Sequence, residues 1–69
     1  GEQGLIGESG IVIQAITPEK EGKISVHGEI WTARSSHSLQ KGEKGVVQAV
    51  DGLVVTVVPE KNSKNNKEG

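Results

Sequence analysis

The residues of this chain that could do chemistry are few, and the densest group lies in one polar stretch. Ser35, Ser36 and Ser38 surround His37, and a serine hydroxyl becomes a nucleophile when a nearby histidine accepts its proton. Neighbouring positions in a loop do not create that geometry, and no glycine-rich elbow accompanies them that could help form an oxyanion site. We therefore interpret 35–38 as a polar loop, predict no catalytic residue and expect the chain not to be an enzyme.

Metal and cofactor sites are not expected either. The chain has no cysteine and only two histidines, His27 and His37, and neither lies in a spacing typical of zinc or calcium ligands. His27 precedes a glycine and suits a turn position with positive φ. The glycine-rich run GLIGESG at 4–10 precedes a predicted strand, whereas a phosphate-binding loop joins a strand to a helix. We predict no cofactor and no metal.

Trp31 is the only aromatic residue of the chain, and it can be interpreted in two ways. As a packing residue it would fill a gap in an aliphatic core, and its replacement by alanine would cost about 3–5 kcal/mol. As an interaction anchor it would lie exposed, with Glu29 and Arg34 as the rim of the contact. We favour packing with one edge of the ring accessible and keep the interaction role as the alternative.

The composition bounds the class of protein. Sixty-nine residues, 32% of them hydrophobic and nearly all of those aliphatic, form one small domain whose β-branched core favours sheets. Eight basic and nine acidic residues give a net charge of −1, and no stretch before the tail concentrates one sign, whereas nucleic acid or an anionic membrane surface would require a basic stripe. No apolar run approaches the ~18 residues of a membrane span.

Hydrophobic periodicity predicts five strands, separated by turn residues. The strands are expected at 10–17, 23–27, 29–34, 45–50 and 53–58. His27-Gly28 and Asp51-Gly52 predict tight hairpin turns, and the polar stretch 35–44 predicts a loop that contains a lone Leu39.

Five short strands without a convincing helix favour a closed barrel, because closure removes exposed strand edges. A three-stranded meander, a longer connection and a final hairpin outline an all-β, five-stranded barrel of the oligonucleotide/oligosaccharide-binding (OB) type. Little or no helix is expected between strands three and four, and an SH3-like barrel is the alternative. We predict an entry loop or linker over 1–9, the barrel over 10–58 and a disordered polar tail over 59–69.

Several short segments carry a family resemblance through their order and spacing. They are LIG at 5–7, GKI at 22–24, GEIWTA at 28–33, KG at 41–42 and VDGL at 50–53. Together they resemble the C-terminal soluble domain of the NfeD family over about residues 5–58, with Gly45 as a departure from the usual pattern. The resemblance implies an OB-like barrel joined to membrane helices outside this chain and, in long members, to a ClpP-class serine protease domain.

The function that the resemblance implies is protein–protein interaction. Such proteins are typically encoded beside stomatin-type (band 7) membrane proteins, are thought to assemble with them, and are mostly placed with this domain facing the cytoplasm. We therefore expect a non-catalytic assembly module with a stomatin-type partner, able to self-associate or dock through an apolar strip. The alternative is a single-stranded nucleic-acid-binding OB domain, which would ordinarily present several stacking aromatics in a basic groove.

Overall fold

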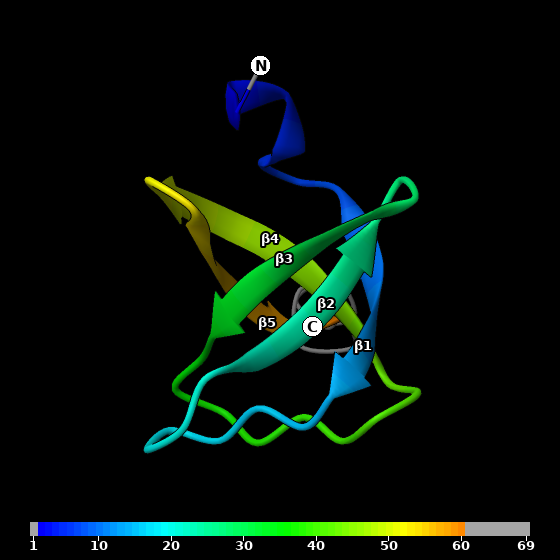
Figure 1. Cartoon of the computed structure of the whole chain (residues 1–69), viewed down its shortest axis with the longest axis vertical. Helices are drawn as coiled ribbons and strands as arrows, with labels where there is room; N and C mark the ends of the chain where they lie inside the picture. Colours follow the sequence, from blue (N-terminus) through cyan, green and yellow to red (C-terminus); the bar gives the residue numbers. More distant parts are fainter. Residues whose placement is uncertain (1, 61–69) are drawn as a thin grey trace, which may run out of the picture.

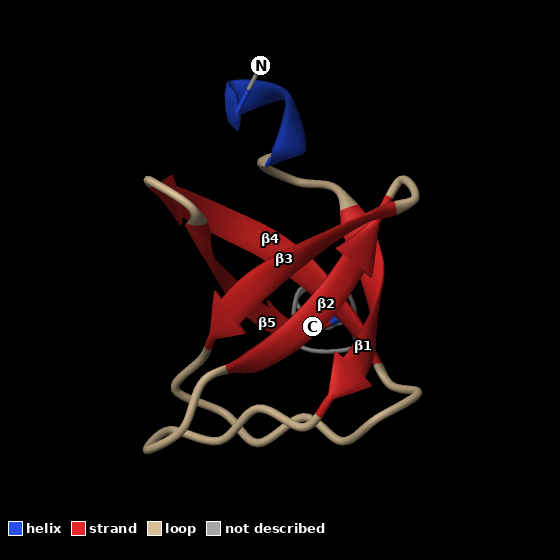
Figure 2. Cartoon of the chain, viewed as in Figure 1, coloured by secondary structure: helices blue, strands red, loops and turns tan. Residues whose placement is uncertain are grey.

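The computed structural model describes residues 2–60, so the predicted disordered tail lies, from residue 61 onward, outside the described residues. A short 3-10 helix precedes five strands, and loops make up the rest of the described chain (Figures 1 and 2). The elements are η1 (Glu2–Leu5), β1 (Ser9–Gln14), β2 (Gly22–Val26), β3 (Glu29–Arg34), β4 (Lys44–Asp51) and β5 (Val54–Pro59).

The strands close into a barrel in the order β1-β2-β3-β5-β4. Every neighbouring pair is antiparallel except β3 and β5, which run parallel. A meander whose third strand meets the last hairpin in this way has the arrangement of the five-stranded OB barrel. The predicted all-β, OB-like fold is thereby confirmed over the SH3-like alternative.

The hairpin between β2 and β3 forms where the sequence predicted it. His27 and Gly28 both have positive φ, 52° and 80°, as a type I′ turn requires of its two central residues. The turn closes on the pair Val26 and Glu29. Because this turn fixes the register, β3 occupies the predicted residues 29–34.

The hairpin between β4 and β5 forms one residue later than predicted. Asp51 pairs with Val54 as the last rung of the ladder, so the turn consists of Gly52 and Leu53. Gly52 has a φ of 65°, which fits a type II′ turn with glycine at its first central position. The displacement places Leu53 at the tip of the turn.

β1 is shorter than predicted, since its register with β2 shifts between Val12 and Gln14 and the strand ends there. Ile16 instead forms an isolated bridge with Leu39, in which each backbone N–H donates to the other's carbonyl at 2.9 and 2.8 Å. Leu39, predicted in a loop, is 1% exposed. The connection between β3 and β4 contains no helix and inserts Leu39 into the core instead.

The core is aliphatic, as the composition predicted, and is built from alternate residues of every strand. Its buried members are Leu5, Val12, Ile16, Ile24, Val26, Ala33, Leu39, Val47, Val55 and Val57. Leu5 comes from η1, which lies within the segment predicted as an entry loop. Gly45 belongs to β4 and pairs with Gly10 and Pro59, so the departure from the family pattern does not interrupt that strand.

Candidate functional site

β3 positions the residues of greatest interest through simple strand alternation. Ala33 faces the interior and is fully buried, and Trp31 on the same face is half-buried and packs against the core. Ile30 faces outward, where 64% of it is exposed. Trp31 therefore packs against the core and is partly exposed, and its role as an interaction anchor stays a prediction.

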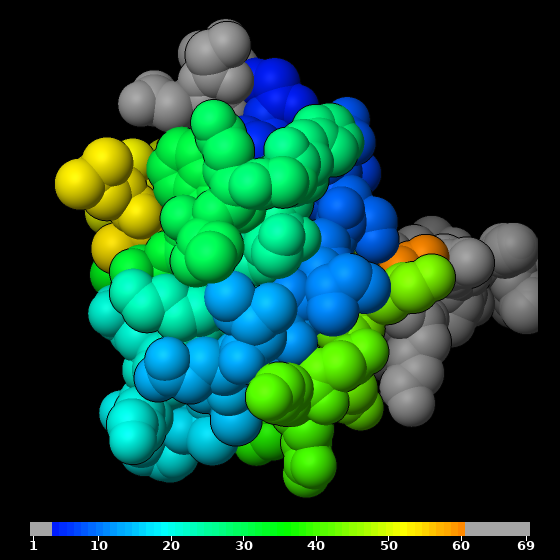
Figure 3. Space-filling model, turned by 45° about the vertical axis from the view of Figure 1, so that its right-hand side comes forward, coloured from blue at the N-terminus to red at the C-terminus, as the bar shows by residue number. Residues whose placement is uncertain are grey.

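A surface groove lies along the first half of β3. It has a volume of about 530 Å3 and is lined by Glu29, Ile30, Trp31, Thr32 and Leu53; we call it the β3 groove. Leu53, at the tip of the β4–β5 turn, is 80% exposed. In Figure 3 that turn, coloured yellow, projects beside the green atoms of β3. The groove thus gathers two exposed aliphatic side chains beside the one tryptophan.

The groove exists because β5 pairs with only the second half of β3, whereas β2 pairs with nearly the whole strand. Its ladder with β5 begins at Thr32 and Val54 and continues only to Arg34. Figure 1 shows β3 and β5 beginning on opposite sides of the view and converging toward the end of β3. The β4–β5 turn therefore leaves the first residues of β3 uncovered on that side.

The indole of Trp31 carries an unusual polar atom. Its Nε1 exposes less than 1 Å2 and, among the described residues, has no hydrogen-bond acceptor. A buried donor without a partner costs about 1–3 kcal/mol. This cost offsets part of the stability that packing of the ring against the core contributes.

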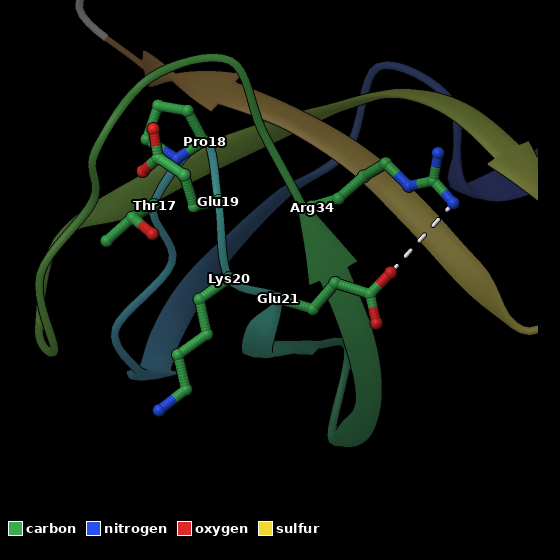
Figure 4. Close-up of a pocket in the computed structure, with 6 residues that line it drawn as sticks. All are labelled: Thr17, Pro18, Glu19, Lys20, Glu21 and Arg34. Carbon is green, nitrogen blue, oxygen red and sulfur yellow. Dashed lines mark ion pairs between the residues drawn. The ribbon is translucent and has the colours of Figure 1, made fainter.

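Arg34, predicted with Glu29 as the rim of a contact around Trp31, does not line the β3 groove. It lies at the opposite end of β3 and lines a second hollow together with the turn 17–21 (Figure 4). Its Nη2 is 3.9 Å from Oε2 of Glu21, with both side chains about half exposed. An ion pair this long and this exposed contributes little. Only Glu29 of the two accompanies Trp31.

The serine-rich loop has a structural arrangement. Ser35 is 7% exposed, and its Oγ accepts a hydrogen bond from the backbone N–H of His37 at 3.0 Å. The hydroxyl thus stabilises a local turn. His27 lies elsewhere, with its Nε2 3.0 Å from Oε1 of Glu8 at the surface.

Neither a metal centre nor a membrane-spanning helix is found among the described residues. The described residues contain no cluster of three or more His, Cys, Asp or Glu side chains that could hold a metal ion. Over the same residues no helix has the length and apolar character needed to cross a membrane. A small β-barrel with a groove lined by exposed aliphatic side chains and a tryptophan has the surface features of a binding domain.

Comparison with known proteins agrees with that class. The model of the NfeD-like C-terminal, partner-binding domain matches residues 2–59. The chain belongs to the NfeD family, and the family resemblance of the sequence is confirmed. The matching region is the partner-binding domain of the family.

One curated relative is similar over nearly the whole chain. It is the membrane-bound protease PH1510 of Pyrococcus horikoshii, which is 41% identical over 69 residues. The match covers 97% of this chain but 15% of that protein. This chain therefore corresponds to a small part of that relative's length.

Solved structures show the same barrel in three organisms. The C-terminal domain of stomatin operon partner protein 1510-C from P. horikoshii is 43% identical, with a TM-score of 0.77 over 86% of this chain and 92% of that one. The soluble domain of a Corynebacterium glutamicum membrane protein implicated in regulation of membrane protease activity is 27% identical, with a TM-score of 0.80 over 87% and 98%. The soluble domain of the Bacillus subtilis NfeD protein YuaF is 25% identical, with a TM-score of 0.77 over 84% and 76%.

Proposed function

We propose that this chain is the assembly module of a membrane-anchored NfeD protein and that it binds a stomatin-type (band 7) membrane protein through the β3 groove. The observation that carries the proposal is the exposure of Ile30 and Leu53 beside Trp31. Exposed aliphatic residues are ordinary when scattered, but apolar side chains gathered around a concave site are typical of a contact surface. The name of the P. horikoshii relative, a stomatin operon partner, supports this class of partner.

The charge of the groove favours a protein over a nucleic acid. Among the described residues, Glu29 is the only ionisable residue that lines it, and the Lys23 ammonium lies beside it, 3.2 Å from Oγ1 of Thr32. One lysine at the margin is far short of the basic groove that a phosphate backbone requires, and the carboxylate would repel phosphates. The two aliphatic side chains and the tryptophan are the types that form the apolar centre of protein interfaces.

The proposal also includes a position for the module in its parent. We place any protease activity of the parent outside this chain, because the relative named a protease is much longer than the region matched. We also place the module on the cytoplasmic side of the membrane that anchors the parent. Protease protection in intact cells tests that placement, since a cytoplasmic module would be digested only after lysis.

Binding of purified proteins tests the function directly. The stomatin-type protein of the same organism is immobilised in detergent, and binding of the chain is measured by biolayer interferometry. We expect specific binding, weakened about tenfold or more in Leu53→Ser and Ile30→Ser, since burying a Leu or Ile side chain contributes about 1.5–3 kcal/mol. Both side chains are mostly exposed, so we expect the thermal midpoints of these variants to stay close to that of the parent chain.

The matched control is Ile13→Ser, on β1, which β2 separates from β3. Ile13 is 36% exposed and does not line the groove, so we expect its affinity to stay within about twofold of that of the unmodified chain. Equal binding by all three variants, or binding of an oligothymidylate at micromolar affinity in place of the protein, would show that the proposal is wrong.

A further inference from the structure

We propose that the partner contributes an extended apolar segment that adds as a strand to the free edge of β3; this inference rests on the function proposed above. β3 pairs with β2 from Glu29 through Ala33, but with β5 only from Thr32 onward. The residues 29–31 therefore have a paired strand on one side and the β3 groove on the other. A peptide strand is the occupant whose backbone matches such an edge.

The hairpin geometry determines which backbone groups face the groove. In a two-residue hairpin, the closing pair, here Val26 and Glu29, is a hydrogen-bonded pair, and hydrogen-bonded and non-hydrogen-bonded pairs then alternate along the strands. The N–H and C=O of Ile30 consequently point away from β2. They point to the side where the β5 ladder has not yet begun, so they offer one donor and one acceptor to an incoming strand.

This edge lacks the features that usually keep strands from pairing with other chains. Natural edges are protected by lysine, proline, bulges or covering segments. The residues 29–31 contain neither lysine nor proline, and their register with β2 is continuous. The single charge is that of Glu29, at the start of the strand. Ile30 and Leu53 add apolar side chains next to the exposed backbone.

The same residues define the chemistry of the occupant. An extended segment advances about 3.3 Å per residue, so roughly three to five residues would span the free edge. Its side chains beside Ile30 and Leu53 would be aliphatic or aromatic, because those two side chains form the apolar wall. A basic residue beside Glu29 would complement its carboxylate, the one charged group among the described residues that line the groove.

A substitution at one position separates strand addition from simple apolar contact. Ile30→Pro removes the N–H that faces the groove while leaving the β2 ladder intact, because proline is tolerated where the N–H is free. Ile30→Ala is the matched control, since it removes the side chain but keeps the N–H. The probes are overlapping ten-residue peptides that cover the sequence of the stomatin-type protein, and binding is followed through the fluorescence of Trp31.

We expect one peptide region to bind, and Ile30→Pro to weaken that binding at least tenfold more than Ile30→Ala does. We also expect the peptide to slow hydrogen exchange of the Ile30 amide at least tenfold. N-methylation of the peptide backbone should abolish binding at alternate positions only, and this readout remains available if the proline variant does not fold.

Three results would overturn the inference. Equal losses for Ile30→Pro and Ile30→Ala, with an unprotected Ile30 amide, would contradict strand addition and leave the proposed groove contact standing. Absence of any peptide binding, although the whole partner binds at the groove, would contradict an extended segment as the occupant. Protection of the Ile30 amide by the chain alone, rising with its concentration alongside dimer formation, would assign the edge to a second copy.

Discussion

Replacement of Trp31 by phenylalanine and by alanine separates the stability contributed by packing of the ring from the cost of its unpaired N–H. Trp31 packs against the core while its Nε1 has no acceptor among the described residues. Alanine removes both the ring and the uncompensated donor. Phenylalanine keeps most of the apolar ring and removes only the donor and the smaller part of the indole.

The magnitudes differ enough to be measured. A fully buried aromatic residue costs about 3–5 kcal/mol when it is replaced by alanine. Two facts reduce this cost for Trp31. The residue is only half-buried, and the substitution also removes an unpaired buried N–H that costs the folded state about 1–3 kcal/mol. We therefore expect Trp31→Ala to lower the free energy of unfolding by about 2–3 kcal/mol. In Trp31→Phe the packing loss is smaller, and removal of the unpaired N–H offsets it. We therefore expect the free energy of unfolding to change by no more than about 1 kcal/mol.

Urea denaturation followed by far-ultraviolet circular dichroism measures both variants, since neither keeps the tryptophan. In a domain of this size, about 2–3 kcal/mol corresponds to a fall in Tm of roughly 10–20 °C. Equal destabilisation by the two substitutions would refute the reasoning about the unpaired donor. A loss below about 1 kcal/mol for Trp31→Ala would refute the packing role itself.

Three further predictions concern the fold that holds the groove. Gly10→Ala should cost about 1–3 kcal/mol in a urea titration, because a Cβ there would lie 2.5 Å from the carbonyl oxygen of Ser25; no loss would show that the two strands separate easily. His27→Val should lower the thermal midpoint by the equivalent of about 1–2 kcal/mol, because the residue has a φ of 52°, whereas His27→Asn should not. Leu39→Ala should cost about 2–5 kcal/mol by calorimetry, since Leu39 is 1% exposed; a smaller loss would place this side chain outside the core.

Much of the fold could be predicted because its signals are local. The alternation of Ile24 and Val26 marks β2, and the turn His27-Gly28 fixes where β3 begins. By contrast, the end of β1 depends on a register shift against β2. The burial of Leu39 depends on a bridge to Ile16, far away in the sequence. Neither can be found by periodicity within a short window.

The site was harder to predict than the fold, because the groove forms where the β2–β3 ladder extends beyond the β3–β5 ladder. Strand alternation places Glu29 and Arg34 on opposite faces of β3, but it left open which face points inward and did not show that the two side chains would line hollows at opposite ends of the strand. Leu53 was predicted as the first residue of a strand. Its place at the tip of the turn follows from the pairing of Asp51 with Val54. This register differs by one residue from the predicted one and depends on how the two strands pack in the barrel.

The measurement that tests the central claim most directly is a map of the partner's contact by nuclear magnetic resonance. The chain is labelled with 15N and titrated with the purified stomatin-type protein of the same organism. The account predicts that amide shifts and signal loss concentrate at residues 29–32 and at Leu53, and that Ile13 and the turn 17–21 stay unchanged. Perturbation centred on β1 or on the hollow beside Arg34, with the β3 groove unaffected, would contradict it.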